Sequence, residues 1–313
     1  MDLSIIIINW KSVAYLRNCL KSVFQQVHEF EYEVIVVDND SGDHCREILA
    51  EEFPSVKCVE SKKNLGFSGG NNLGFTYSSG HTLLFLNPDT EIRGNAVGVL
   101  YSTLASSPKI GAVGGMLLNT DLSLQTSCVL PFPTILRQLL DIEWLKRKFP
   151  ESDFWGIRPL LGRQKGPAAV EALSGACLMV RRDVFESIGR FSTDYFMYAE
   201  DIDLCYKIHE SGLKVVYVNS AHVVHHGGGS TKNSRQLNFN SVLMRQANLI
   251  FLKKHRSAGY AFAYRLSTGM AAVVRMLLLS PLVPRVGTAG IRKWFGIFRW
   301  SLGLEAWSIH PSL

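Results

Sequence analysis

Apolar residues follow two alternating spacings along the first part of the chain. Continuous β-branched runs, such as the isoleucines within residues 4–8, predict strands buried on both faces of a parallel sheet. Apolar residues that return every three or four positions predict helices. Strands are expected at 4–8, 33–37, 56–60, 82–86 and 110–118, and helices at 12–26, 71–79, 96–106 and after Asp43, which could cap its helix. This alternation predicts an α/β fold, a doubly wound and mostly parallel sheet with helices on both faces.

The second half of the chain is less regular. Residues 120–168 carry five prolines and predict an irregular excursion. Further on we expect order at 171–181, a loop at 198–203, a helix ending near 211, a strand at 214–218, a glycine-rich loop at 222–230 and helices from Asn240. The pattern therefore predicts a folded body at 1–240 and a helical tail at 241–313.

Charge is divided unevenly along the chain. The net charge is +6, but residues 1–210 carry 20 Lys and Arg against 26 Asp and Glu, whereas residues 211–313 carry 13 against the single acid Glu305. With 47% hydrophobic and 19% charged residues, the composition is that of a folded protein and not of a disordered one. An acidic body with a basic, apolar tail is the result.

Several classes of protein are excluded by missing motifs. The six cysteines form no CxxC pair, so neither a zinc knuckle nor a disulfide framework is indicated. The start of the chain lacks the basic region of a signal peptide and is expected to be a strand. Asn9-Trp10-Lys11 follows that strand in place of a G-x-G-x-x-G turn, and there is no Walker A loop. This argues against a nicotinamide enzyme and against a P-loop NTPase.

The tail has features of a membrane surface rather than of a membrane span. Its longest charge-free stretches, 266–274 and 276–284, are nine residues each and are separated by Arg275, whereas a span needs about 20 apolar residues. Residues 291–302 mix tryptophan and phenylalanine with arginine and lysine, which suits the interface of an anionic membrane. A dimer contact or a plain packing helix remains the alternative. No nucleic-acid-binding module is present.

Polar residues gather where the predicted strands end. Asn9, Asp38 and Asp89 each follow a strand, and ligands of such sheets bind beyond the carboxyl ends of the strands. Asp38 could accept a hydrogen bond from a base or a ribose, or could simply belong to a turn. Asp89 could hold Mg²⁺ or Mn²⁺ together with diphosphate oxygens, or could equally end an ordinary turn. The glycines and asparagines of residues 64–72 lead into a helix and favour binding of an anionic ligand.

Two further clusters could carry chemistry. Three acids, Glu200, Asp201 and Asp203, lie within four residues, either offset by a partner or serving as the acidic first turn of a helix. His225 and His226 precede three glycines, where a metal or phosphate site and a structural role are both open.

Together these segments resemble a known family. In order they read IIIINWKS, VVDNDS, NLGFSGGNNLGF, LFLNPDTE, SGACLMVRRDVFESIGRF, FMYAEDIDLC and HHGGGST. They are similar to glycosyltransferase family 2, with the GT-A fold, and within it to the bacterial rhamnosyltransferase-like branch. The match covers roughly residues 1–255. It divides the predicted body into a nucleotide-sugar half, about 1–118, and an acceptor half, about 119–240.

The resemblance implies roles for named residues. It assigns nucleotide-sugar binding to Asn9, Asp38, Asn39, Asn64, Gly66, Phe67, Asn71, Asn72 and Asn87. It assigns a divalent cation, Mg²⁺ or Mn²⁺, to Asp89, Glu91 and His225, with His226 as a rival for His225. Asp201 matches the catalytic base, supported by Glu200 and Asp203. Asn87 replaces the first acid of the family's Asp-x-Asp motif, and Ser192-Thr193 replaces its usual Asp-Glu.

The function implied is an inverting sugar transfer from a nucleotide diphosphate donor. The branch favours L-rhamnose from dTDP-rhamnose, moved to a polyprenyl-diphosphate-linked saccharide or a polysaccharide in bacterial cell-surface glycan synthesis. The enzyme would be cytoplasmic and peripheral on the inner face of the plasma membrane, which it would contact through the C-terminal region. A UDP-hexose donor and a catalytically silent nucleotide-sugar-binding subunit are the alternatives.

Overall fold

The chain forms two compact units. The computed structural model describes residues 1–149, 151–156, 160, 166–227, 234–282 and 288–304. The first unit, here the sheet unit, comprises Met1–Phe132, Glu151–Thr193 and Glu200–Gly229, and the second, here the helical unit, comprises Pro133–Pro150, Asp194–Ala199 and Ser230–Leu313. Part of the excursion expected at 120–168 therefore belongs with the tail helices, a division that the predicted boundary at residue 240 does not anticipate.

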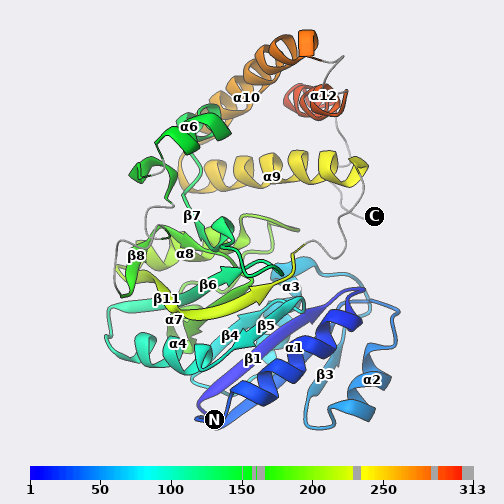
Figure 1. Cartoon of the computed structure of the whole chain (residues 1–313), viewed down its shortest axis with the longest axis vertical. Helices are drawn as coiled ribbons and strands as arrows, with labels where there is room; N and C mark the ends of the chain where they lie inside the picture. The colour runs from blue at the N-terminus through cyan, green and yellow to red at the C-terminus, as the bar shows by residue number, and fades with distance from the viewer. Residues whose placement is uncertain (150, 157–159, 161–165, 228–233, 283–287, 305–313) are drawn as a thin grey trace. The chain divides into compact units, whose positions relative to one another are not determined.

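The sheet unit is built on one mixed sheet (Figure 1). Its strand order is β3-β2-β1-β4-β10-β6-β11-β5, with β8 paired to β11. The strands are β1 (Leu3–Asn9), β2 (Tyr32–Asp38), β3 (Lys57–Glu60), β4 (Thr82–Leu86), β5 (Thr90–Arg93), β6 (Ile110–Leu118), β8 (Ala168–Val170), β10 (Cys177–Arg181) and β11 (Lys214–His225). The first four strands in this order are parallel, and antiparallel pairing begins at β10.

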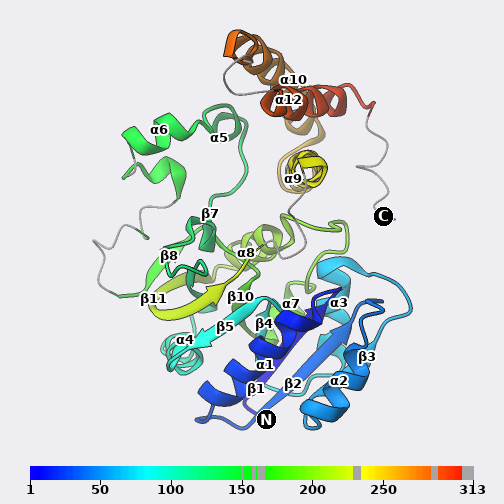
Figure 2. The ribbon, with the colours of Figure 1, turned by 45° about the vertical axis from the view of Figure 1, so that its right-hand side comes forward.

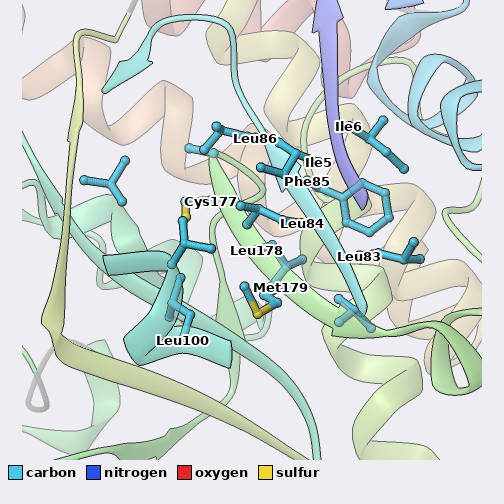
Figure 3. Close-up of a cluster of buried hydrophobic side chains, with 14 of the residues drawn as sticks. Ile5, Ile6, Leu83, Leu84, Phe85, Leu86, Leu100, Cys177, Leu178 and Met179 are labelled. Atoms are coloured by element: carbon cyan, nitrogen blue, oxygen red, sulfur yellow. The ribbon is translucent and has the colours of Figure 1, made fainter. Parts of the chain in front are cut away.

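Helices cover both faces of this sheet. They are α1 (Val13–Gln26), α2 (Cys45–Glu52), α3 (Gly66–Thr76), α4 (Ala96–Ala105), α7 (Arg182–Ser187) and α8 (Glu200–Glu210). Right-handed crossovers put α1 and α2 on one face and α3 on the other. At Gly74, a Cβ atom would lie 2.6 Å from Ile6 Cγ2, so the glycine lets α3 approach β1 closely. Figure 3 shows the core, in which side chains of β4 lie among those of β1 and β10.

An aromatic cluster fixes α3 to the sheet. Phe185 lies 5.2 Å from Phe75 and 4.9 Å from Phe85 between ring centroids, and Phe191 lies 4.8 Å from Phe85. The Phe67 ring meets the Phe191 ring edge-on at 5.5 Å. Such pairs add to the energy of area burial. Phe185 of α7 thus packs on the end of α3, and Phe191, which follows α7, packs on its start.

Four local predictions were wrong. α3 begins at Gly66 rather than at 71, because Gly66 adopts a φ of +68° that turns the chain into the helix. His44, and not Asp43, occupies the cap position of α2, where no side chain caps the helix. β11 continues to His225 through the expected loop because His222–His225 pairs with β5; residues 228–230 of that loop lie outside the described part. α8 already begins at Glu200, within the expected loop.

Other elements were missed because they are short. β5 and α7 were not predicted, and 171–181 divides into β9 (Ala172–Leu173) and β10. The segment expected to be irregular holds β7 (Val129–Leu130), α5 (Ile135–Leu139), α6 (Glu143–Lys148) and β8. β7 and β9 form a second, two-stranded sheet.

The helical unit contains three long helices that contact one another (Figure 2). They are α9 (Ser234–His255), α10 (Ala258–Leu279) and α12 (Ala289–Ser301). Trp300 of α12 is 1% exposed and donates from its indole to Gln246, while Trp294 lies under the Arg275 guanidinium, 4.4 Å from its centroid. Trp300 is therefore a packing residue of this unit, while Phe295 of the same helix is 51% exposed, and the membrane contact expected from residues 291–302 stays a prediction.

α10 joins the two charge-free stretches of the tail into one helix. It is continuous through Arg275, and by length and composition alone it could cross a membrane. Of its most apolar window, 22% is buried within the protein. Length and composition do not establish a span, so the expectation that the tail does not cross a membrane stays a prediction.

Candidate active site

Asn9 joins the ends of the first two strands from inside the protein. Its amide donates to Ser41 Oγ at 3.0 Å and to the Asp43 carboxylate at 3.1 Å, and its Oδ1 accepts from Ser12 Oγ. The residue is completely buried. Asn9 therefore positions the turn that follows Asp38, the last residue of β2.

Asp38 belongs to a group of potential metal ligands. One ligand atom each of Asp38, Asp43 and Cys45 lie within 4.8 Å of one another. However, Asp43 already accepts hydrogen bonds from Asn9 and from the Val13 N–H. A hydrogen bond with Cys58 and burial raise the pKa of the Cys45 thiol, which keeps it protonated. This group is part of the local hydrogen bonding, and its members are poor candidates for holding a cation.

The loop before α3 is held by asparagine side chains. The Asn39 amide donates to Asn64 Oδ1 at 3.0 Å and to the Gly66 carbonyl at 3.2 Å, and its Oδ1 accepts from the Leu65 N–H. Asn64 Oδ1 also accepts from the Gly66 N–H. Asn39 and Asn64 thus shape the loop that the sequence predicts to bind the nucleotide.

Phe67, in the first turn of α3, contacts the segment that holds Asp201, whereas Asn71 and Asn72 make other contacts. Asn72 is engaged elsewhere, since its amide exchanges two hydrogen bonds with the backbone of Phe191. The Asn71 amide donates to the Phe67 carbonyl, while Asn71 Oδ1 is buried without a hydrogen-bond partner among the described residues. A Cβ atom at Gly175 would lie 2.9 Å from Phe67 Cζ, so Phe67 packs directly on that glycine.

Asp89 and His225 form the pair at the end of β4. His225 Nε2 lies 3.3 Å from Asp89 Oδ1 and 3.4 Å from Asn87 Nδ2. Gln125 Oε1 lies 2.7 Å from His225 Nδ1, so it accepts the proton there and leaves Nε2 as the atom that turns toward Asp89. Burial raises the pKa of Asp89, but the hydrogen bond and charge of His225 outweigh it and the pKa lies below its ordinary value.

His226 and Glu91 form a separate pair. His226 Nε2 lies 2.9 Å from Glu91 Oε1, and its Nδ1 lies 3.0 Å from Thr120 Oγ1. In the part of the chain that the structure describes, no third His, Cys, Asp or Glu ligand joins Asp89 and His225. In the structure, His225 thus lies beside Asp89 and His226 beside Glu91.

The Asp89–His225 pair fits a divalent cation of the expected kind. A carboxylate oxygen and an imidazole nitrogen 3.3 Å apart are spaced as neighbouring ligands of one ion, and both side chains are partly exposed at 17% and 16%. Mn²⁺ accepts imidazole and carboxylate together, and ions that serve phosphate chemistry keep positions for substrate oxygens and water. Glu91 is not part of this donor pair.

Asp201 is held by backbone groups. Its Oδ2 accepts from the Gly175 N–H at 2.9 Å, and its Oδ1 accepts from the Ile202 N–H at 2.8 Å. Burial raises the pKa of Asp201, while these N–H groups act in the opposite direction. A carboxylate with a raised pKa is the better general base near neutral pH.

Its acidic neighbours differ from it. Glu200 is 6% exposed, and burial together with the charge of Asp201 raises the pKa of Glu200 to about 8. Asp203 is completely buried, 3.4 Å from Lys207 Nζ. Because the pKa of Glu200 lies above neutral pH, Glu200 binds a proton there. This removes the like-charge repulsion between Glu200 and Asp201 that the sequence predicts.

One short segment links the two halves of the site. The Gly175 N–H donates to Asp201, and the next residue, Ala176, accepts from the Asn87 N–H at 2.9 Å. Asn87 in turn lies beside His225. Two consecutive residues before β10 thus connect the predicted base with the strand end that carries the predicted metal pair.

Comparisons with known proteins identify the family of the chain. Residues 4–189 match the model of Glycosyl transferase family 2. The chain belongs to glycosyltransferase family 2. It is 30% identical over 229 residues to a low-salt glycan biosynthesis hexosyltransferase of Haloferax volcanii, covering 72% of this chain and 67% of the relative. It is 29% identical over 209 residues to an N-acetylglucosaminyl-diphospho-decaprenol L-rhamnosyltransferase of Mycobacterium tuberculosis, covering 63% and 67%.

Solved structures show the fold. A mannosyltransferase of Pyrobaculum calidifontis, in complex with GDP-Man and Mn²⁺, superposes with a TM-score of 0.61 at 16% identity, covering 99% of this chain and 88% of that one. The structure of GalNAc-T7 with UDP, GalNAc and Mn²⁺ gives a TM-score of 0.59 at 15% identity, covering 100% of this chain and 58% of that one. The predicted family and the GT-A fold are confirmed, and this glycosyltransferase has rhamnosyltransferases among its relatives.

Sequence reasoning missed two residues of the site. Gln125 lies in the segment without a readable pattern, and nothing in its neighbourhood signals a contact with His225, 100 positions away. Gly175 stands inside a segment that carries the family resemblance, and a glycine at the start of an apolar strand was the available signal.

A pocket elsewhere in the sheet unit is not this site. It encloses about 560 Å³ and is lined by His81, Thr82, Arg181 and Arg182 among others, at the opposite ends of β4 and β10. Arg181 forms an ion pair with Asp183, which offsets its positive charge toward the pocket. None of the predicted site residues lines it.

Proposed function

We propose that this glycosyltransferase moves a sugar, with inversion, from a nucleotide diphosphate donor to a lipid-linked or polysaccharide acceptor. The observation that carries the proposal is the link through Gly175 and Ala176, which joins Asp201 to the strand end of Asn87 and the Asp89–His225 pair. A base on one side and a diphosphate-binding strand end on the other are what such a transfer requires.

In the proposed mechanism Asp201 acts on the acceptor. Its carboxylate takes the proton of the attacking hydroxyl while the acceptor oxygen bonds to the anomeric carbon and the nucleotide diphosphate leaves from the opposite face. Proton transfer of this kind contributes about 10²–10⁴ in rate. The N–H groups of Gly175 and Ile202 hold the carboxylate in one orientation during the step.

Asp89 and His225 would hold the divalent cation. When bound, the ion supplies positive charge against the charge that develops on the departing diphosphate. Gln125 keeps the proton on His225 Nδ1, so that Nε2 would be free to hold the ion. The half-buried Asp38 is proposed to accept from the base or the ribose, and the loop shaped by Asn39 and Asn64 to enclose the nucleotide.

The donor proposed is dTDP-rhamnose, with a UDP-hexose as the alternative. The rhamnosyltransferase among the relatives supports this choice. That relative is named for a lipid-linked acceptor, N-acetylglucosaminyl-diphospho-decaprenol, and an acceptor of this class is proposed here. The enzyme would then work at the cytoplasmic face of the membrane, with the helical unit toward the lipid.

The test is transfer of sugar to an N-acetylglucosaminyl-diphospho-polyprenol acceptor in the presence of Mn²⁺. dTDP-rhamnose, UDP-glucose and UDP-N-acetylglucosamine are offered separately to the wild type, Asp201→Asn and a control, Asp183→Asn, whose carboxylate is 66% exposed and paired with Arg181. We expect transfer from dTDP-rhamnose, a loss of about 10²–10⁴-fold in Asp201→Asn and no loss in the control. Equal transfer by Asp201→Asn would refute its role, and transfer only from a UDP-sugar would refute the donor.

A further inference from the structure

The outward face of α10 is apolar along most of its length. Between Phe262 and Leu278, every residue that is exposed is also apolar. These residues are Phe262, Ala263, Leu266, Met270, Val273, Val274, Leu277 and Leu278. Their spacing of three or four positions places them in one stripe. A helix on the surface of a water-soluble domain has the opposite pattern, with its polar face outward.

The charged residues of α10 are turned inward instead. Arg265 donates to the carbonyls of Trp300 and Ser301 at the end of α12, at 2.9 and 3.0 Å. Arg275 donates to the Leu139 carbonyl at 3.2 Å and stacks on Trp294. Both arginines of the helix therefore bind groups inside the helical unit, and the exposed stripe carries no charge.

A second exposed apolar set lies beside α10 in the same unit. The segment that contains α5 and α6 contacts α10, since the Ile135 N–H donates to Tyr260 and Arg275 reaches the carbonyl of Asp141. Its exposed apolar side chains are Leu136, Leu140, Ile142, Trp144 and Phe149. Trp144 is 62% exposed. Together with the stripe they exceed the scattered single residues that a soluble surface normally shows.

Exposed cations lie next to α10 in the sequence and on the helix that packs against it. Lys253 and Arg256 are exposed just before α10, and Arg292 and Arg299 are exposed on α12, which contacts α10; the exposed Asp141 is an acid within the α5–α6 segment. Residues 211–313 contain a single acid, Glu305, against 13 basic residues. Apolar side chains flanked by cations match the chemistry of a bilayer with anionic headgroups, which attracts nearby lysine and arginine.

The one-sided pattern decides how α10 would meet a bilayer. A spanning helix would bring both faces to membrane depth, whereas the inward face of α10 carries Arg265 and Arg275 and packs on α9 and α12. We propose that α10 lies in the plane of an anionic bilayer, with the stripe from Phe262 to Leu278 immersed at the headgroup boundary. This rests on the proposed function only in so far as a lipid-linked acceptor requires the enzyme at a membrane.

The test measures binding of the full chain to preformed vesicles by flotation. Vesicles of phosphatidylethanolamine with a quarter phosphatidylglycerol are compared with vesicles of phosphatidylcholine alone. The variant Leu266→Gln/Leu277→Gln removes apolar contact without changing charge, and the control Leu122→Gln alters a side chain that is 51% exposed in the sheet unit. Circular dichroism melting of each variant confirms folding.

We expect the wild type and Leu122→Gln to float with the anionic vesicles, and the double variant to lose at least ten-fold in bound fraction. Wild-type protein that fails to float, or a double variant that floats unchanged, overturns the proposal. A wild type that stays off vesicles but sediments as a dimer, with the double variant monomeric, overturns it in favour of self-association. Stabilisation by dTDP-rhamnose is measured on the same samples: its absence in a protein that floats refutes the proposed function and not the membrane surface.

Discussion

The two units of this glycosyltransferase expose opposite kinds of surface. Of the 20 large hydrophobic side chains exposed among the described residues, 17 belong to the helical unit. The sheet unit exposes only Met1, Tyr77 and Leu122 among those described. Its apolar residues fill a core around the sheet, and its polar residues at the strand ends are joined by hydrogen bonds.

If the proposals hold, this difference means that chemistry and location depend on different residues. In the sheet unit, side chains such as Asn9, Asn39 and Asn72 position their neighbours, and Asp89, His225 and Asp201 are the residues proposed for the reaction. In the helical unit, the arginines of α10 are used internally, which leaves an apolar face outward. Substitutions in one unit should therefore leave the other unit's property intact.

Asp89→Asn is expected to have the largest effect on sugar transfer while leaving membrane binding unchanged. Loss of the carboxylate weakens the ion that offsets charge on the leaving diphosphate, so kcat/KM for transfer should fall about 10²–10³-fold. Binding to anionic vesicles should not change, because α10 is untouched. Kinetics and flotation on one preparation check both statements. A parallel fall in vesicle binding would contradict the claim that the two units carry independent properties.

A smaller effect is expected from Gln125→Leu. Without an acceptor at His225 Nδ1, the ring loses its fixed orientation, and partners of this kind are worth about 10- to 100-fold in metal affinity. Titration of Mn²⁺ by electron paramagnetic resonance in the absence of donor measures the change directly. Thr120→Val is the matched control, because Thr120 contacts His226 instead. An equal loss of Mn²⁺ affinity in Thr120→Val would contradict the proposal that His225, and not His226, holds the ion.

Gly175→Ala should lower stability by about 1–3 kcal/mol, because the added methyl would lie 2.9 Å from Phe67 Cζ and the neighbour must move. Chemical denaturation measures the change. Gly259→Ala in the helical unit is the counterpart: its nearest neighbour would be 3.9 Å away, and alanine in a helix should stabilise by up to about 1 kcal/mol. The same sign for both would contradict the close contact at Gly175.

The smallest effect concerns pH. Because the pKa of Glu200 is raised to about 8, the folded protein binds a proton there that the unfolded chain releases at a lower pH. Its contribution to stability is fully present below the pKa of the unfolded chain and is lost as the pH rises through about 8. Glu200→Gln should flatten this decline in melting temperature. An unchanged pH profile in the variant would show that Glu200 is ionised in the folded protein.

The parallel half of the sheet was readable from the sequence. Its strands are apolar runs between turns, and 82–86 was predicted with the bounds of β4. Beyond that half, 110–118 was predicted with the bounds of β6. β5 was missed because Thr90–Arg93 is too short to show a period. β11 was cut short because the histidines before the glycines are typical of a loop, whereas His222–His225 pairs with β5 in the structure.

The strand-end rule proposed part of the candidate site. It pointed to Asn9, Asp38 and Asp89, whereas His225 was expected in a loop and was proposed only through the family resemblance. Which histidine accompanies Asp89 depends on the register between β11 and β5, and the role of Gln125 depends on a contact across 100 residues, so neither could be derived from local pattern. Which face α10 exposes could not be predicted either, because it depends on the contacts of Arg275 with Leu139 and Trp294, which are distant in sequence.

The most direct test of the account is whether a nucleotide diphosphate sugar binds this chain through a divalent ion at Asp89 and His225. The measurement is the unfolding free energy of the full chain with dTDP-rhamnose, with Mn²⁺, and with both. The account predicts stabilisation by the donor of about 2.7 kcal/mol at 100 times its Kd in Mn²⁺, lost on chelation and in Asp89→Asn. Equal stabilisation of the wild type and Asp89→Asn, or none by any nucleotide sugar with Mn²⁺ present, would contradict it.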